Sequence, residues 1–360
     1  MNMSTRRITG LRQRIKKENL DGMVITHGDH VRYLTGYTGT NGLLVVTMKE
    51  ALFFTDFRYT DQAKKQVKGA KCLIADKGDL IANLQNYPKL NGMNWRYGFA
   101  PDYFTVGEFN HLAGVLDNAI MVEAGDVLRD LGWVKEKNEI QSIEKAVEIS
   151  DEALARVLGL VKPGIRESEL AAELEYQMIM LGSEKRAFET IVASGYRSAM
   201  PHGVASQKKL KKDEFVTFDF GATVDGYVSD ITRTVVVGKA TKRQKRVYDI
   251  VLRSQLAGIK KVKAGVMGRE VDETCRKIIR KAGYGKNFGH GTGHGIGFYI
   301  HTGPRVSPIS EDKLQANNVI TIEPGIYISG WGGVRIEDDV VVTRKGGRVL
   351  NKAEKKLLEL

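Results

Sequence analysis

The sequence predicts an α/β protein of two domains, an α/β domain with a mixed sheet followed by an α+β domain. Its 360 residues exceed the usual size of one domain, and helix-like and strand-like patterns alternate over the first third. The later part combines long amphipathic helices with β-branched runs that predict hairpins. We place the two domains at residues 1–128 and 129–360.

The first domain opens with an amphipathic helix over residues 8–20, in which Ile8, Leu11 and Ile15 share one face. Short apolar runs bounded by polar residues then predict further elements. The expected strands are residues 21–26, 41–47, 51–55 and 70–75, with a helix at 58–67 between the last two. This order predicts a sheet whose strands run in mixed directions.

The second domain begins with a long helix at residues 134–161, where apolar residues recur with helical spacing. A Pro-Gly pair at 163–164 ends that helix, because proline lacks the backbone donor and glycine favours a turn. A second helix is expected over residues 167–182, where it stops at a glycine. The acid-bearing strand runs follow these two helices.

The charge balance is basic. Lys and Arg number 55 against 43 Asp and Glu, with short basic runs at residues 6–17, 208–212 and 242–246. Helix-turn-helix, zinc-finger and aromatic strand motifs do not accompany these runs, so we predict no nucleic-acid partner. The charged N-terminal segment and the lack of an apolar run of about 18 residues predict a cytoplasmic protein without a membrane partner.

The first candidate site is a hairpin at residues 216–238, whose Asp225-Gly226 pair is a strong signal for a two-residue turn. In that register residue 219 pairs with residue 232, so Asp219 and Asp230 lie diagonally on one face, about 7–8 Å apart between backbones. Two such carboxylates can share a cation. The alternative is a pair of aspartates on a solvent-exposed face.

A second hairpin is predicted at residues 319–342. A register centred on Gly330 puts Glu323 opposite Glu337 across the two strands. Because like charges in such positions repel unless a cation joins them, a second acidic pair favours a site over an exposed surface.

Between the hairpins, residues 289–301 read GHGTGHGIGFYIH and contain three of the seven histidines. In an extended conformation His290, Thr292, His294 and Ile296 share one side, while the glycines let the backbone approach a neighbouring sheet. A single histidine is usually structural. Three histidines on a glycine-rich strand favour a functional site.

Four carboxylates and an imidazole in one cleft would carry about four negative charges, which burial would drive towards protonation. Two divalent cations would neutralise them. Oxygen-rich ligation with one nitrogen suits Mn²⁺, Co²⁺ or Zn²⁺, whereas structural zinc prefers Cys and His. We therefore predict a centre of two divalent metal ions, for which Mn²⁺, Co²⁺ and Zn²⁺ are all candidates.

These motifs resemble the pita-bread metallopeptidases, the family of aminopeptidase P, prolidase, methionine aminopeptidase and the creatinases. The likeness runs over almost the whole chain, beginning with VRYLTGYTGTNG and LFFTDFRYTDQA. In the later part the matching segments are FETIVASGYRSAMPHG, DFGATVDGYVSDITRT, GHGTGHGIG, TIEPGIYI and GVRIEDD. The resemblance implies a creatinase-like N-terminal domain followed by a pita-bread catalytic domain.

The resemblance also implies roles for nine residues. The implied metal ligands, of which Asp230 and Glu337 bridge the ions, are Asp219, Asp230, His294, Glu323 and Glu337. Glu323 would handle the proton of a hydroxide held between the metals, with His202 and His301 as catalytic imidazoles. The implied substrate-side residues are His202, His290, His301 and Arg335. Arg335 shares a strand face with Glu337, so we expect it to bind a carboxylate of Asp219 or of the substrate.

Two positions depart from the family pattern. Tyr299 and Thr302 stand where the family commonly has acids. The five expected ligands are unaffected, but the charge beside the substrate, and with it the substrate preference, is altered.

The expected activity is that of an Xaa-Pro aminopeptidase, which acts on peptides with proline in second position, and Xaa-Pro dipeptidase is the alternative. The creatinase-like first domain disfavours methionine aminopeptidase, whose chains resemble only the second part. A metal-free binding protein on the same fold is disfavoured because all five expected ligands are present. The resemblance further suggests a homodimer.

Overall fold

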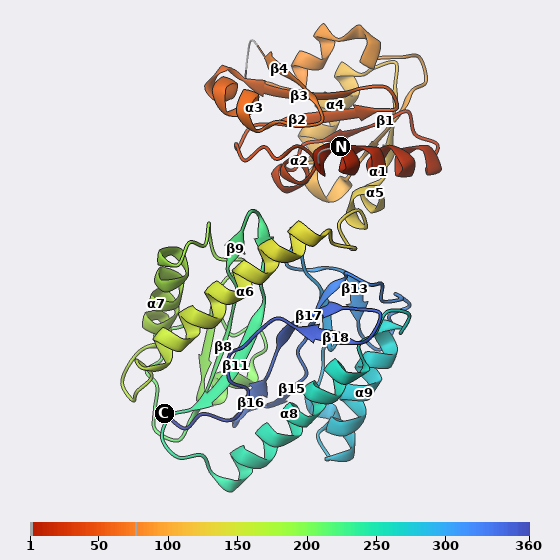
Figure 1. Ribbon diagram of the computed structural model, residues 1–360. Coiled ribbons are helices and arrows are strands. Elements are labelled where there is room, and N and C mark those ends of the chain that lie inside the picture. The colour runs from red at the N-terminus through yellow and green to blue at the C-terminus, as the bar shows by residue number, and fades with distance from the viewer. Residues whose placement is uncertain (1–2, 76–77) are drawn as a thin grey trace. The chain divides into compact units, whose positions relative to one another are not determined.

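The computed structural model describes residues 3–75 and 78–360, and the chain divides into two compact units between Gly132 and Trp133. Each unit contains its own helices and strands (Figure 1). The division lies a few residues beyond the boundary expected from the sequence.

Within the described residues, the first unit has a six-stranded sheet in the order β4-β3-β2-β1-β5-β6. Its strands are β1 (Gly22–Ile25), β2 (Leu43–Thr47), β3 (Ala51–Asp56), β4 (Lys71–Ala75), β5 (Arg96–Phe99) and β6 (Ile120–Glu123). Its helices are α1 (Met3–Lys17), α2 (Gly28–Thr35), α3 (Thr60–Gln66), α4 (Val106–Val115) and α5 (Gly125–Arg129). Strand β2 pairs antiparallel with β1 and β3, whereas β4, β5 and β6 join in parallel, so the predicted mixed sheet is confirmed.

Both faces of this sheet are buried. Successive side chains of a strand point to opposite faces, and in β2 Leu44 packs into one core with Leu11 of α1. Its neighbour Val45 packs into another core with Leu112 of α4. The predicted apolar face of the first helix is therefore confirmed as the cover of one side of the sheet.

The second unit contains four longer helices and a set of short strands. The helices are α6 (Lys137–Leu158), α7 (Glu167–Met180), α8 (Lys242–Lys261) and α9 (Gly268–Lys281). The strands up to the glycine-rich segment are β7 (Ile191–Ser194), β8 (Phe215–Phe220), β9 (Thr223–Val224), β10 (Tyr227–Val228), β11 (Ile231–Val236) and β12 (Gly293–Gly295). The remaining strands are β13 (Thr302–Val306), β14 (Val319–Ile322), β15 (Gly325–Ile328), β16 (Gly332–Arg335), β17 (Asp338–Val342) and β18 (Gly347–Val349).

The two helix pairs pack against different strands of the second unit (Figure 1). Leu154 of α6 and Leu174 of α7 share a core with Phe218 of β8. Val251 of α8 and its neighbours on α9 share another core with Ile336, which lies between β16 and β17. Since helices cover the strands on both sides, acids at the strand ends lie in the interior of the unit.

Both predicted hairpin registers are confirmed. In the first hairpin Val224 pairs with Tyr227 and Asp219 pairs with Thr232. The two turn residues have positive φ angles, 53° at Asp225 and 81° at Gly226, as a two-residue turn of this kind requires.

The second hairpin keeps one register on both sides of an interruption. Gly325 pairs with Arg335 and Ile322 pairs with Asp338, and both pairs are centred on Gly330. The ladder is broken between them, at residues 323–324 on one strand and 336–337 on the other. Glu323 and Glu337 therefore lie at matching breaks, where the regular ladder does not fix the backbone.

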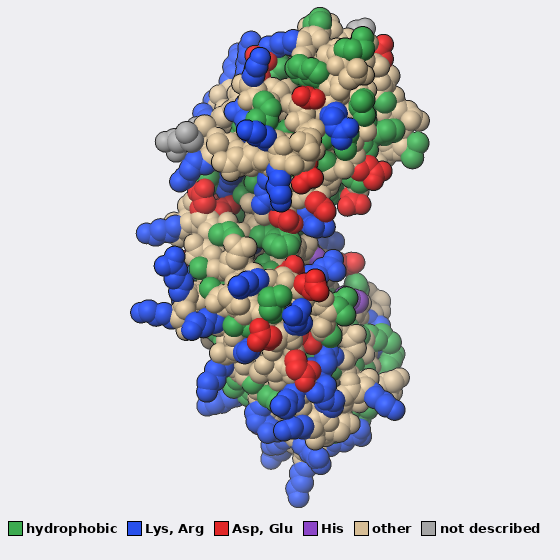
Figure 2. All heavy atoms as spheres, turned by 90° about the vertical axis from the view of Figure 1, so that its right-hand side faces the viewer, with side chains coloured by type: hydrophobic (Ala, Val, Ile, Leu, Met, Phe, Trp, Pro, Cys, Tyr) green, Lys and Arg blue, Asp and Glu red, His purple; other side chains and the backbone are tan. Residues whose placement is uncertain are grey.

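The surface of the second unit is rich in basic side chains. Figure 2 shows Lys and Arg gathered at its lower end, where α8 begins with the exposed basic residues of the run 242–246. Acidic side chains are mixed with them higher up. Of the helices in residues 3–75 and 78–360, none is both long and apolar enough to cross a bilayer.

Candidate metal centre

A cavity of about 430 Å³ in the second unit is lined by all nine residues for which the sequence predicts a role. These nine residues are Asp219, Asp230, Glu323, Glu337, His202, His290, His294, His301 and Arg335, and a further acid that the sequence did not single out, Glu189, also lines the cavity. Apolar side chains complete much of the wall, among them Phe188, Ile191, Pro201, Val204 and Ile300. Residues from both hairpins, the glycine-rich segment and the loop after β7 thus meet in one place.

The innermost group is Asp230, His294 and Glu337. Each offers a ligand atom, and these atoms all lie within 4.8 Å of one another. The Nε2 atom of His294 lies 3.6 Å from Asp230 Oδ2 and 3.4 Å from Glu323 Oε1. Four of the five predicted ligands therefore surround one small volume.

The fifth predicted ligand, Asp219, faces the same cavity and accepts a hydrogen bond from Nη2 of Arg335. Of the two partners expected for Arg335, Asp219 is the one that the structure shows. The guanidinium is held in place from other sides as well. Its Nε donates to Thr232 Oγ1 at 3.0 Å and its Nη1 to the hydroxyl of Tyr327 at 2.9 Å.

Thr232 and Tyr327 are site residues that sequence reasoning missed. Thr232 donates from its hydroxyl to Glu337 Oε2 at 2.5 Å, so β11 orients the carboxylate that lies in the break before β17. A signal for it was present, because the predicted register already places Thr232 opposite Asp219. Tyr327 had no such signal, since its position beside His290 depends on contacts between distant segments.

The glycine-rich segment meets the prediction only in part. His290 and His294 reach the cavity, but Thr292 donates from its backbone and hydroxyl to Asp272 of α9, and Ile296 lies in the core. The expectation that all four share one side is wrong, because the segment is a regular strand only over β12 and the buried carboxylate of Asp272 draws Thr292 away.

The expected role of the glycines in this segment holds at two positions. A Cβ atom at Gly293 would lie 2.0 Å from the carbonyl oxygen of Thr321. A Cβ atom at Gly295 would lie 2.0 Å from that of Gly303. These glycines let β12 press between its neighbours and carry His294 to the acids.

Burial and mutual repulsion raise the carboxylate pKa values at this centre. Burial, followed by the charge of Glu337, raises the pKa of Asp230 well above its usual range. Burial and then Glu323 do the same to the pKa of Glu337. Burial raises the pKa of Glu323 to about 7, although Arg335 opposes the shift. Holding the acids close together therefore costs free energy through burial and repulsion, and bound cations would lower that cost.

The imidazoles of His290 and His294 are neutral, so one ring nitrogen of each carries a lone pair. Burial lowers the pKa of His294 to about 3 and that of His290 to about 4. The Nδ1 atom of His294 lies 3.1 Å from the carbonyl oxygen of Gly295, which acts only as an acceptor. The proton therefore sits on Nδ1, and the lone pair of Nε2 points to Asp230 and Glu323.

This donor set fits divalent cations. Closely spaced carboxylate oxygens and one neutral imidazole nitrogen match the preferences of Mn²⁺, Co²⁺ and catalytic Zn²⁺. The hydrogen bond that fixes the tautomer of His294 is the kind of support that metal-binding histidines usually have.

Comparison with known proteins places the chain in a family. Residues 141–344 match metallopeptidase family M24, and residues 7–131 match the creatinase/prolidase N-terminal domain. The chain is 43% identical over 350 residues to the uncharacterized peptidase YqhT of Bacillus subtilis, which covers 97% of this chain and 99% of that relative.

Two solved structures have the same fold. An Xaa-Pro dipeptidase from Bacillus anthracis superposes with a TM-score of 0.95 at 40% identity, covering 99% of this chain and 100% of that chain. An X-Pro aminopeptidase from Thermotoga maritima MSB8 gives a TM-score of 0.89 at 34% identity, covering 97% and 100% of the two chains.

The fold and the matches define a metallopeptidase, and hence a hydrolase. The chain belongs to metallopeptidase family M24, with a creatinase/prolidase N-terminal domain in front of the peptidase domain. The pita-bread fold expected from the motifs is thereby confirmed. Peptidases of this family are dinuclear metal enzymes, and Asp230, His294 and Glu337 form a group able to hold metal in this chain.

Proposed function

We propose that this protein is an Xaa-Pro dipeptidase that hydrolyses the bond before proline with the help of two divalent cations. The observation that carries the proposal is the likeness to the Xaa-Pro dipeptidase of Bacillus anthracis over the whole chain, at 40% identity. This reverses the preference for an aminopeptidase that the motifs alone suggested. Xaa-Pro aminopeptidase is the second candidate, favoured by the likeness to the Thermotoga maritima enzyme at 34% identity.

The size and lining of the cavity suit a short proline peptide. A volume of about 430 Å³ lies towards the small end of ligand pockets, which span roughly 300–1,000 Å³. Apolar walls from Phe188, Ile191 and Val204 suit a proline ring and an apolar first residue. Because proline has no backbone N–H, a site that does not grip that donor is needed to cleave before it.

The five proposed metal ligands have different roles in holding the two cations. We expect Asp230 and Glu337 to bridge the ions and Asp219, His294 and Glu323 to hold them individually. When bound, divalent ions lower the pKa of water and polarise a carbonyl group. Arg335 orients Asp219 and Thr232 orients Glu337, so neither carboxylate has to move when a cation arrives.

Proton transfer falls to Glu323 and the imidazoles. Glu323 lines the cavity beside His294, where its carboxylate would accept and return the proton of the attacking water. His202 and His301 line the outer part of the cavity and are exposed, so they can donate to the carbonyl oxygen or to the leaving nitrogen of a bound peptide. His290 is half-buried and contacts Tyr327, which suits it to shape the substrate side.

The test is a substrate panel with purified protein reconstituted with Mn²⁺, and with Co²⁺ or Zn²⁺ in parallel. We expect Xaa-Pro dipeptides to be cleaved with kcat/KM at least about tenfold above that of Xaa-Pro-Xaa tripeptides. Xaa-Ala dipeptides are the matched control for proline selectivity. Faster cleavage of the tripeptides would favour the aminopeptidase, and cleavage of neither would reject both candidates.

The proposal also covers the metal, the assembly, the location and the partners of the protein. We propose Mn²⁺ as the working metal, a homodimer as the assembly and the cytoplasm as the location, with no nucleic-acid or membrane partner. Metal analysis of protein purified without chelator and sedimentation of the purified protein test the first two. Retention on a DNA column at physiological salt would contradict the absence of a nucleic-acid partner.

A further inference from the structure

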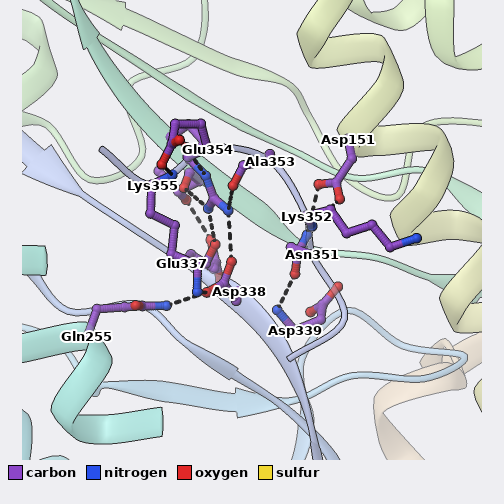
Figure 3. Close-up of polar contacts among 12 residues, drawn as sticks. Asp151, Gln255, Glu337, Asp338, Asp339, Asn351, Lys352, Ala353, Glu354 and Lys355 are labelled. Carbon is purple, nitrogen blue, oxygen red and sulfur yellow. Dashed lines mark hydrogen bonds and ion pairs between the residues drawn. The ribbon is translucent and has the colours of Figure 1, made fainter. Parts of the chain in front are cut away.

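A second buried charge cluster lies directly behind the candidate metal centre. Glu337 lines the cavity, whereas the next residue, Asp338, is fully buried and points away from it. Its carboxylate pairs with the ammonium of Lys355 and accepts from Gln255 Nε2 at 2.6 Å, as Figure 3 shows. On the other oxygen it accepts from Nη2 of Arg233 at 2.8 Å.

Arg233 ties this cluster to the strands that carry the predicted ligands. Its Nη1 donates to the carbonyl oxygen of Glu337 at 2.5 Å and to that of Thr232 at 2.9 Å. Its remaining donors bind the C-terminal segment, through the carbonyl oxygens of Glu354 at 3.1 Å and Ala353 at 3.0 Å. All five N–H groups of the guanidinium therefore have partners, and its position is fixed.

A parallel chain of contacts reaches Asp230. The backbone N–H of Asp230 donates to Asp339 Oδ2 at 2.9 Å, and Asp339 in turn donates from its backbone to Asn351 Oδ1 at 2.7 Å. Asn351 and the backbone of Lys352 are anchored on Asp151 of α6 (Figure 3). The same C-terminal segment thus supports both acids that are predicted to bridge the metals.

We propose that a positioning layer holds Asp230 and Glu337 in the spacing that divalent cations need, and so sets the metal affinity of the site. The layer consists of Arg233, Asp338, Asp339, Asn351 and Lys355. The inference rests on the proposed metal centre and assigns to the C-terminal segment a role in metal binding.

The physical basis is the cost of bringing like charges together. Asp230, Glu323 and Glu337 repel one another, so flexible carboxylates would move apart and would have to be gathered again by each arriving ion. Contacts that fix them beforehand remove that cost. Loss of outer-shell partners typically weakens metal binding about 10–100-fold in proteins, which sets the size of the expected effect.

The competing explanation is that these charged residues act on the cations only through their electrostatic field. Substitutions that remove charges of opposite sign distinguish this explanation from positioning. Lys355→Met removes a positive charge near the site, so the field alone would tighten cation binding. Asp338→Asn removes a negative charge, so the field alone would weaken it. Because both substitutions loosen the layer, positioning predicts weaker binding in both variants.

The experiment titrates MnCl₂ into chelator-treated full-length protein by calorimetry and follows thermal unfolding of each apoprotein. The matched control is Lys352→Met, which removes the same charge from the same segment. The Lys352 side chain is 79% exposed, and its ammonium lies 3.7 Å from the surface acid Glu148. Lys355→Arg, which keeps the charge and a donor, is the rescue variant.

We expect Lys355→Met and Asp338→Asn to weaken Mn²⁺ binding about tenfold or more. Lys352→Met should match the wild type and Lys355→Arg should recover most of the affinity. Opposite signs for the first two variants, or unchanged affinity in both, would overturn the proposal. Should Asp338→Asn fail to fold, Lys355→Met still decides by its sign. A wild type that binds no Mn²⁺ would instead reject the metal centre itself.

Discussion

Glu337 and Asp338 are neighbours in the chain, both are buried, and they solve the problem of a buried charge in different ways. Asp338 is neutralised by the protein itself, through Arg233 and Lys355. Glu337 lies beside Asp230 and His294, and burial, followed by the negative charges of Glu323 and Asp219, raises its pKa well above the usual range. Asp338 is paired with cations of the protein, whereas on our proposal Glu337 takes its cations from solution.

The difference matters because the two residues are consecutive, so the contacts of Asp338 also fix the position of Glu337. A buried carboxylate is costly unless it is paired, and each unpaired one gains from any cation that reaches it. The ion pairs of Asp338 with Arg233 and Lys355 hold the start of β17 in place. At the acids that have no such partner, the repulsion between carboxylates favours the binding of cations.

The largest expected effect comes from removing a bridging acid. Glu337→Ala or Asp230→Ala should lose at least about a hundredfold in activity together with most of the bound metal, because even outer-shell partners are worth about 10–100-fold. Metal content by atomic emission and kcat/KM on an Xaa-Pro dipeptide measure the two losses. The control is Glu144→Ala, which removes an acid that pairs only with the exposed side chain of Arg348. Full metal content in Glu337→Ala would contradict the contrast between the two sides.

His301→Ala should separate binding of metal from turnover. His301 lines the cavity but is exposed, and its ring lies beside that of His294 at 4.4 Å between centroids. If it donates a proton or hydrogen bond to the reacting peptide, its loss costs about 10²–10⁴-fold in kcat while the metal stays bound. Metal content that falls as far as activity does would show that His301 acts as a ligand.

Much of this site was predictable because its geometry follows from local patterns. The Asp225-Gly226 turn fixes the register of its hairpin, and that register brings Asp219 opposite Thr232. Centring on Gly330 likewise predicts the alignment of the second hairpin, including the acids at its breaks. Charge repulsion then pointed to cations without knowledge of the fold.

The unpredicted part depends on contacts between distant segments. Lys355 reaches Asp338, and Tyr327 meets His290, only after helices and strands have packed. Thr292 was expected on the histidine side by strand alternation, but Asp272 of α9 offered a buried acceptor that no local pattern in the glycine-rich segment reveals. The choice between dipeptide and longer substrates was equally beyond the motifs, which both activities share.

A smaller effect is expected where the two hairpins touch. Thr232→Val keeps the shape of the side chain but removes the hydroxyl that donates to Glu337 and accepts from Arg335. We expect Mn²⁺ affinity to fall about tenfold, as for other outer-shell partners. Thr217→Val is the matched control, since its hydroxyl is equally buried but contacts Thr234. Equal affinity losses in the two variants would show that the strand pair, and not the hydroxyl, sets the affinity.

The smallest expected effect is on the stability of the apoprotein, and its sign follows from the raised carboxyl pKa values. A carboxyl with a raised folded-state pKa holds its proton in the native state after the unfolded chain has released it, so stability falls as pH rises through the folded value. The half-buried histidines His290 and His294 have the opposite influence, which fades above their ordinary pKa of about 6.5. Between pH 6.5 and 8 the acids therefore dominate, and metal-free protein should lose stability with rising pH.

Glu323 alone, with its pKa raised to about 7, accounts for roughly 1 kcal/mol over that interval. Urea unfolding of the chelated protein at several pH values measures the slope, and Glu323→Gln, which cannot ionise, should flatten it. Saturating Mn²⁺ should also flatten the slope, because the cations pair with the ionised carboxylates and make protonation unnecessary. A metal-free protein as stable at pH 8 as at pH 6.5 would mean that these acids ionise freely, and the contrast between Glu337 and Asp338 would then have no energetic basis.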